Sequence, residues 1–321
     1  MRPASHRPMN SVYTLADLAD WERVTAAEPV PLRLAVLGDP VAHSASPPMQ
    51  NAALAACGIA ARYCRLHIRP EEFSDALRLL AKRNFIGVNC TIPHKGAALA
   101  AMDEADEHAH RAAGVNTILF GNDGHLRGFS TDGPGLARAV REQLGADLRD
   151  LRVLVLGAGG GAGRAVAMQC ASDGARALTL INRSPEKLQP LHDAIASFYP
   201  RESLTLAPWE DAALARALDL ADLVVNCSAL GMKPGDPSPI PTSFLAARHL
   251  LYDTIYTAAR TPLMRAADTA GARSANGHSM LLHQGAIAFE HWFPHPAPLE
   301  VMRAALVQGT GGSSGETIPS S

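Results

Sequence analysis

The segment VLVLGAGGGA, from Val153 to Ala162, constrains the fold of this chain most strongly. It places a buried-type strand directly before the spacing G-x-G-x-x-A, and a helix of small residues is predicted to follow. Gly157 permits a tight turn, Gly159 lets the backbone approach a pyrophosphate, and Ala162 allows close packing of helix on strand. A turn that binds nothing would not need this strand and helix around it. We therefore expect a Rossmann-type, doubly wound nucleotide-binding sheet.

Short β-type runs alternate with helical stretches along most of the chain. After the glycine-rich strand come ALTLIN, LTLAPW, DLVVNC and HLLYDTIY, separated by predicted helices. Before it, LRLAVLG at 32 to 38, RYCRLHI at 62 to 68 and GVNCTI at 87 to 92 form a similar series, and Asn122-Asp123-Gly124 predicts the turn of a hairpin. This alternation is typical of an α/β fold with mainly parallel strands.

The length of 321 residues predicts two domains, because one hydrophobic core usually stops growing before about 250 to 300 residues. We expect an N-terminal α/β substrate-binding domain at 32–132 and the nucleotide-binding domain at 133–276. Helices at 277–308 are predicted to return to the first domain and complete it. Residues 1–31 are interpreted as an N-terminal extension with a small helix near 15–23, and residues 309–321 as a disordered tail.

The composition favours a small-molecule enzyme in the cytoplasm. A net charge of −2 with 47% hydrophobic residues predicts neither nucleic-acid nor membrane partners. Five scattered cysteines lack the close pairs of a zinc site or a disulfide framework, so we predict reduced thiols and no metal. The chain shows no apolar run of the roughly 20 residues that a membrane span needs, and no signal peptide. A homodimer is compatible with these features, but no residue specifies it.

The second strand of the nucleotide-binding domain ends in Asn182-Arg183-Ser184, with Lys187 shortly after. An NAD enzyme would place a carboxylate at this strand end, whereas Arg183 and Lys187 can bind a 2'-phosphate. The alternative is that both are solvated surface cations. Directly after the glycine fingerprint the pair favours NADP, bound over the backbone of the turn, which includes Ala158, Gly160 and Gly161.

Polar side chains gather at the ends of strands in the first half. Asn89 and Thr91 share one side of an extended segment, and Lys95 follows close by. Ser44 and Ser46 precede Pro47 after the first strand, and Asp132 stands at the domain junction. In isolation Ser46 would be a helix N-cap and Lys95 a solvated lysine at a helix start.

Eight short motifs stand in a fixed order along the chain. They are His43-Ser-Ala-Ser-Pro47, Asn89-x-Thr91-x-Pro93-x-Lys95, Gly114-Val-Asn-Thr117, Thr131-Asp-Gly133, Gly157 to Ala162, Asn182-Arg-Ser184, Tyr252-Asp-Thr-Ile-Tyr256 and Gly277-His-Ser-Met-Leu-Leu-His-Gln284. Together they resemble the shikimate dehydrogenase family, and the resemblance extends from Leu32 to Val307.

The resemblance implies reversible, NADP-dependent reduction of 3-dehydroshikimate to shikimate, a step toward chorismate and the aromatic amino acids. It implies that Lys95 and Asp132 form the catalytic pair and that Ser44 and Ser46 bind the substrate carboxylate. Further roles follow by motif: substrate contacts for Asn89, Thr91, Asn116, Asp132, Tyr256 and Gln284, and cofactor contacts for Thr254, Gly277 and Glu107.

Hydride transfer to a ketone develops negative charge on its oxygen, so the Lys95 ammonium suits the predicted site as a positioned cation and proton source. Three residues depart from the family pattern: Ala45, Cys90 and Ser130. Two alternatives therefore stay open, a relative that uses quinate or another cyclohexene acid, and an NADP-binding sensor without catalysis.

Overall fold

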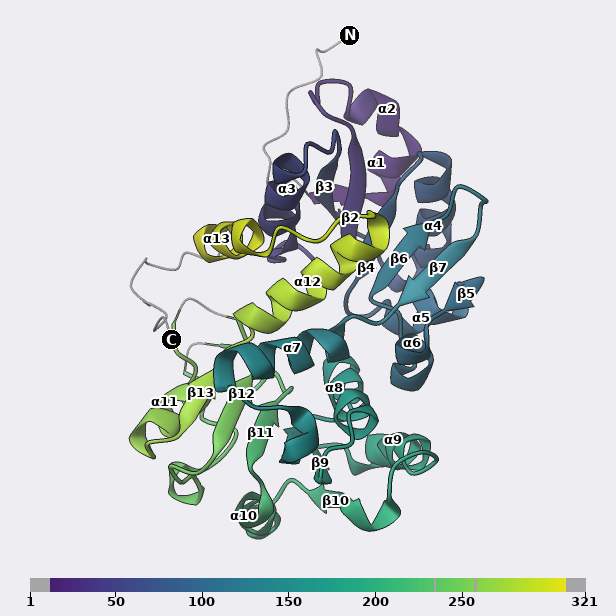
Figure 1. The fold of residues 1–321 in the computed structure, drawn as a ribbon. Coiled ribbons are helices and arrows are strands. Elements are labelled where there is room, and N and C mark those ends of the chain that lie inside the picture. Colours follow the sequence, from purple (N-terminus) through teal and green to yellow (C-terminus); the bar gives the residue numbers. More distant parts are fainter. Residues whose placement is uncertain (1–11, 234, 257–258, 310–321) are drawn as a thin grey trace.

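Two β-sheets form the scaffold of the computed structural model, which describes residues 12–233, 235–256 and 259–309 (Figure 1). The first sheet has the strand order β1-β3-β2-β4-β6-β7-β5. It is mixed, because β6 runs antiparallel to both β4 and β7 while the other neighbours are parallel. Its strands are β1 (Val12–Thr14), β2 (Leu32–Gly38), β3 (Arg62–His67), β4 (Gly87–Cys90), β5 (Glu104–Ala105), β6 (Thr117–Phe120) and β7 (Leu126–Phe129).

Six short helices accompany this sheet, and the predicted hairpin is present as β6 and β7. The helices are α1 (Leu15–Ala19), α2 (Trp21–Val24), α3 (Ser46–Ala56), α4 (Phe73–Lys82), α5 (Lys95–Ala100) and α6 (Glu107–Ala112). Acidic Asp75 in the first turn of α4 and basic Lys82 in its last turn both match the helix dipole. α4 buries Phe73, Ala76, Leu77 and Leu80 against the sheet.

The second sheet is all parallel, with the order β10-β9-β8-β11-β12-β13. Counted from its own first strand this is 3-2-1-4-5-6, the order of the dinucleotide-binding fold. The Rossmann-type prediction is therefore confirmed. The strands are β8 (Arg152–Leu156), β9 (Ala177–Asn182), β10 (Leu204–Pro208), β11 (Leu223–Asn226), β12 (Leu250–Asp253) and β13 (Arg273–Ala275), and the helices are α8 (Gly161–Ser172), α9 (Leu188–Ile195), α10 (Asp211–Leu220) and α11 (Pro262–Thr269).

Helices α7 (Asp132–Leu144) and α12 (His278–Trp292) run between the two sheets (Figure 1). The final helix, α13 (Leu299–Gly309), packs against α3, and Met302 and Leu306 join the core there. Residues from the end of the chain thus complete the packing of the first sheet. The predicted tail at 309–321 is wrong at its first residue, because Gly309 ends α13. Residues 310–321 lie outside the described residues.

The N-terminal residues differ from the sequence interpretation. Residues 12–24 are not an appendage, because β1 pairs in parallel with β3 and extends the first sheet by one strand. Tyr13, Leu18 and Trp21 are buried in the core, where Trp21 lies edge-on to Tyr13 with ring centroids 5.1 Å apart. The first domain therefore starts at the edge strand and not at Leu32.

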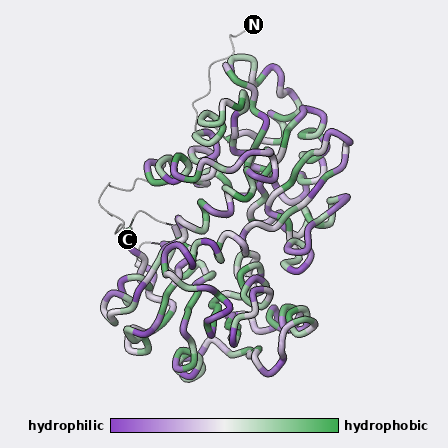
Figure 2. The backbone as a smooth tube through the Cα atoms, viewed as in Figure 1, coloured by the Kyte–Doolittle hydropathy of each residue, from purple (hydrophilic) through white to green (hydrophobic). Residues whose placement is uncertain are grey.

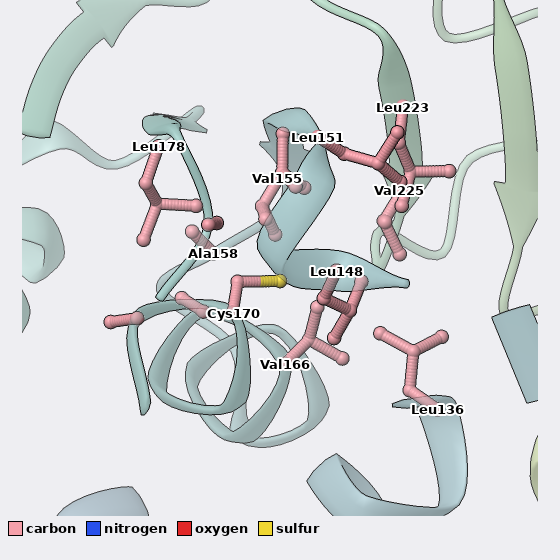
Figure 3. Packing of buried hydrophobic residues seen from close by; sticks show 14 of the residues in the cluster. Leu136, Leu148, Leu151, Val155, Ala158, Val166, Cys170, Leu178, Leu223 and Val225 are labelled. Carbon is pink, nitrogen blue, oxygen red and sulfur yellow. The ribbon is translucent and has the colours of Figure 1, made fainter. Parts of the chain in front are cut away.

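Apolar residues concentrate in the strands and in the helix faces that cover them (Figure 2). In the nucleotide-binding domain, Val166 and Cys170 of α8 pack against Val155 of β8 (Figure 3). This contact holds α8 against β8. In the described parts of the chain, no helix is long and apolar enough to cross a membrane.

The glycine-rich turn is closed by Gly163 and not by Ala162. A Cβ on Gly163 would lie 2.2 Å from the carbonyl oxygen of Gly157, closer than any real Cβ contact. Ala162 instead lines the cavity described below. The packing role predicted for Ala162 belongs to Gly163, because the turn is one residue longer than the spacing G-x-G-x-x-A assumes.

We expect Gly163→Ala to lower the free energy of unfolding by about 1–3 kcal/mol, because the added methyl group would displace the turn. Gly96→Ala is the matched control, since Gly96 also lies in the first turn of a helix but has no heavy atom within 4 Å of the added Cβ. It should be neutral or stabilising by up to about 1 kcal/mol. Urea unfolding measures both, and equal effects would contradict the close packing at Gly163.

Candidate active site

A cavity of about 320 Å³ opens between the domains at the ends of the strands. It is lined by all nine residues predicted to contact the substrate: Ser44, Ser46, Asn89, Thr91, Lys95, Asn116, Asp132, Tyr256 and Gln284. The nucleotide-binding side contributes Ala162, Thr254 and Gly277, three of the residues predicted to contact the cofactor. Residues that are far apart in the sequence therefore meet at one cavity of ligand size, where polar side chains converge.

Lys95 and Asp132 lie side by side in the wall of this cavity. Lys95 is the first residue of α5 and Asp132 the first of α7, and Lys95 Nζ donates to Asp132 Oδ2 at 2.5 Å. The side chains are 21% and 12% exposed, respectively. Screening by water is weaker here than at the surface, so the Coulombic attraction between these two charges is larger than between exposed ones. It brings a cation and a carboxylate together where a ligand can reach both.

Asn116 fixes the second oxygen of that carboxylate. The backbone N–H of Thr131 donates to Asn116 Oδ1 at 2.9 Å, which determines which end of the amide is the oxygen. Asn116 Nδ2 then donates to Asp132 Oδ1 at 2.9 Å. With Lys95 on one oxygen and Asn116 on the other, the Asp132 carboxylate is held in one orientation.

A deeper layer of hydrogen bonds supports Asn116. Asn89 Nδ2 donates to the Asn116 carbonyl at 3.1 Å and to Thr117 Oγ1 at 3.0 Å, while Tyr63 Oη donates to Asn89 Oδ1 at 2.7 Å. Burial raises the pKa of Tyr63 well above its ordinary value, so its hydroxyl stays a donor. The amide nitrogen of Asn89 is fully engaged within the protein, and only its oxygen retains capacity for a ligand.

Ser44 and Ser46 line the cavity at the start of α3. Ser46 is the first residue of that helix rather than its N-cap, and its N–H donates to Ser44 Oγ at 3.3 Å. Because Ser44 Oγ accepts this bond, its own hydroxyl hydrogen remains available to a ligand. Two hydroxyls at a helix N-terminus favour a negatively charged group.

Glycines let α7 approach both of its neighbours. A Cβ on Gly133 would lie 2.9 Å from Gln169 of α8, and one on Gly135 would lie 2.8 Å from the Cβ of Gln284 on α12. Gln284 Oε1 lies 3.4 Å from Asn116 Nδ2. The Thr131-Asp132-Gly133 motif thus combines the carboxylate with the small residues that the junction requires.

Asn182 connects the end of β9 to the glycine-rich turn. Its Oδ1 accepts the Gly159 N–H at 3.3 Å, and its Nδ2 donates to the Ser184 carbonyl at 2.9 Å. Arg183 and Lys187 are exposed beside this turn and form none of the ion pairs found in the described residues. The strand end therefore offers two cations to a phosphate group, as the sequence predicts.

The structure does not bring Glu107 to the cavity. Glu107 starts α6 and pairs with Arg111, which in turn donates to Ser172 Oγ of α8 at 2.7 Å. Its side chain is 75% exposed. Glu107 is thus placed at the outer contact between the domains.

Sequence reasoning missed Tyr63, Thr117 and Thr131, which orient the cavity residues from behind. Thr131 precedes Asp132 in a motif and could have been found, whereas nothing in the sequence distinguishes Tyr63 from an ordinary aromatic residue of the core.

His43 lines the cavity. His94 is instead buried, with Nε2 at 2.7 Å from the Ile68 carbonyl and its ring stacked on Phe73.

Known proteins resemble the chain over most of its length. Residues 36–118 match the family described as shikimate dehydrogenase substrate binding domain, and residues 277–307 match the shikimate 5'-dehydrogenase C-terminal domain. A shikimate dehydrogenase (NADP(+)) from Symbiobacterium thermophilum is 40% identical over 282 residues, which cover 87% of this chain and 95% of the relative.

Solved structures agree with this similarity. Shikimate 5-dehydrogenase from Thermus thermophilus, in complex with NADP(H) and shikimate, is 35% identical with a TM-score of 0.77, covering 87% of this chain and 99% of that one. Quinate dehydrogenase from Corynebacterium glutamicum, in complex with NAD, is 28% identical with a TM-score of 0.78 and the same coverage.

Cys90 lines the cavity, yet we expect it to be unreactive. Burial raises the pKa of its thiol to about 12, and the nearby Lys95 charge only partly offsets this rise. At about pH 8, near the pKa of a free cysteine, Cys90 therefore stays a thiol and resists alkylation. Mass spectrometry after iodoacetamide treatment should find the half-buried Cys57 modified well before Cys90. Modification of Cys90 at the rate of a free thiol would contradict this.

Proposed function

The chain belongs to the shikimate dehydrogenase family, and we propose that it reversibly reduces 3-dehydroshikimate to shikimate with NADPH. The observation that carries the proposal is the Lys95–Asp132 pair at 2.5 Å, in a cavity lined from both domains. A positioned cation and a fixed carboxylate beside a nucleotide-binding turn suit a reaction that transfers a hydride and a proton. The assay is NADPH oxidation with 3-dehydroshikimate. A protein that binds NADPH but oxidises none of it would be the sensor considered above.

The residues around the glycine-rich turn fit a phosphorylated dinucleotide. A Cβ on Gly159 would lie 2.8 Å from Asn182 Nδ2, so the turn leaves room only for bare backbone. α8 starts at Gly161 and directs its first amides at the turn, where they can bind a pyrophosphate. Arg183 and Lys187 would bind the 2'-phosphate. NADPH, when bound there, supplies the hydride for the ketone carbon.

Lys95 would act on the ketone oxygen. Its ammonium stabilises the negative charge that develops on that oxygen and donates the proton that completes the hydroxyl. In the oxidation direction the neutral amine takes the proton back. Asp132 aligns Lys95 through Oδ2 and can accept a substrate hydroxyl, because Asn116 occupies only one direction around Oδ1.

The remaining cavity residues would hold the ring. Ser44 and Ser46 bind the carboxylate at the start of α3, Thr91, Asn116 and Gln284 meet ring hydroxyls, and Tyr256 closes one side. Asn89 contributes its oxygen only, because Thr117 and the Asn116 carbonyl take its two N–H groups. Tyr63 occupies one of the two acceptor directions of that oxygen and leaves the other to a ligand.

A quinate-using enzyme is the second candidate, because the quinate dehydrogenase from Corynebacterium glutamicum has a similar structure. Ser130 departs from the family pattern and is buried at 5% exposure directly before Thr131. Comparing kcat/KM for shikimate and quinate with each cofactor separates the two. A higher value for quinate would make quinate the proposed substrate in place of shikimate.

A cytoplasmic location and a homodimer stay predictions. Light scattering would test the homodimer.

Lys95→Ala should lower kcat at least about 100-fold while the protein still folds and binds NADPH, because a positioned proton donor contributes roughly 10²–10⁴ to the rate. Lys82→Ala, which removes an exposed lysine from α4, is the control. Steady-state kinetics and fluorescence titration of NADPH measure the two effects. A near-normal kcat in the Lys95 variant would refute the proposed role.

Arg183→Ala should raise KM for NADPH about tenfold or more and leave NADH kinetics nearly unchanged, because only NADPH carries the 2'-phosphate. Arg176→Ala is the control, as Arg176 lies exposed near the opposite end of β9. An equal loss with both cofactors would mean that Arg183 does not read the phosphate.

A further inference from the structure

Arg65 is a buried cation directly behind the serine end of the cavity. It lies on β3 at 7% exposure, on the same face of the strand as Tyr63. Its Nε and Nη2 donate to the backbone carbonyl of Ser44 at 3.1 and 2.6 Å. The guanidinium therefore lies against the peptide that carries the Ser44 hydroxyl.

Arg65 differs from the other charged side chains of β3, which pair with carboxylates. Arg62 pairs with Glu28, and His67 Nε2 lies 2.8 Å from Asp39 Oδ1. Among the described residues, no carboxylate pairs with Arg65, and its hydrogen bonds there go to the Ser44 carbonyl. Burial lowers the pKa of Arg65, but a guanidinium remains charged in proteins. A buried charge without a counter-ion is costly unless an anion arrives to pair with it.

The cavity itself lacks a spare positive charge for a carboxylate ligand. Among the described residues, the charged side chains that line the cavity are Lys95 and Asp132, which neutralise each other. His43 also lines it. Ser44 and Ser46 offer two hydroxyls and the N-terminus of α3, which are all uncharged dipoles. Arg65, which is bonded to the Ser44 carbonyl, places a positive charge behind the peptide that carries one of these hydroxyls.

We propose that Arg65 is a positioning residue for substrate selection, which supplies through the Ser44 peptide the positive potential that attracts the substrate carboxylate to Ser44 and Ser46. This inference rests on the proposed function and deepens it. Arg65 does two separable things: its hydrogen bonds hold the loop that carries Ser44, and its charge favours an anion there over a neutral group of the same shape.

Two variants separate these contributions. Arg65→Gln removes the charge but retains an N–H donor for the Ser44 carbonyl, whereas Arg65→Lys keeps the charge and loses the paired donors. Each is assayed for oxidation of shikimate and of its neutral methyl ester with NADP. Arg78→Gln on α4, a surface arginine paired with Asp75, controls for a general change in net charge. Thermal unfolding and NADPH titration show that each variant is folded and binds cofactor.

The charge account predicts that Arg65→Gln raises KM for shikimate about tenfold or more, with kcat changed little and the ester kinetics nearly unchanged. The wild-type preference for acid over ester then shrinks by that factor, and Arg65→Lys restores most of it. An equal loss for acid and ester would mean that Arg65 only tethers the loop, and an unchanged KM would exclude both roles. Wild-type protein without activity on either substrate would instead overturn the proposed function and leave no preference to measure.

Discussion

Asp132 is both the first residue of α7 and the acceptor for Lys95 at 2.5 Å. Because α7 runs between the two sheets, the position of this carboxylate depends on how α7 packs against α8 and α12. Gly133 and Gly135 allow that packing, since a Cβ at either position would lie within 3 Å of a neighbouring helix. The ion pair at the cavity and the junction of the domains are therefore one structural unit.

Asn116 carries this constraint into the first sheet. Its side-chain oxygen accepts a hydrogen bond from the Thr131 N–H, and its side-chain nitrogen donates one to Asp132. Behind it, Asn89, Thr117 and Tyr63 complete a buried network in which each side chain limits the next. Such a network, when its groups are satisfied, rigidifies a site and keeps the acid-base groups in a single geometry. The polar residues of the cavity are thus held in place by the protein itself.

Much of this arrangement could be predicted from the sequence, because it follows from local pattern. The run at 32–38 is β2, ALTLIN is β9, and the turn at Asn122 to Gly124 joins β6 to β7. The Rossmann order followed from a strand, a glycine turn and a helix in succession. Long-range contacts could not be predicted in this way. The pairing of Val12 with Arg65 and the hydrogen bond between Tyr63 and Asn89 depend on segments that meet only in the fold.

The account turns on whether Asn116 holds Asp132, and through it Lys95, in the reactive geometry. The most direct measurement is kcat for 3-dehydroshikimate reduction by Asn116→Ala, beside Asn51→Ala, which removes an amide that bonds the Tyr63 backbone from outside the cavity. The account predicts that the Asn116 variant loses at least about tenfold in kcat with NADPH affinity unchanged, whereas the Asn51 variant loses stability but little kcat. A kcat for the Asn116 variant within about twofold of wild type, a change of under about 0.5 kcal/mol in the barrier, would contradict it.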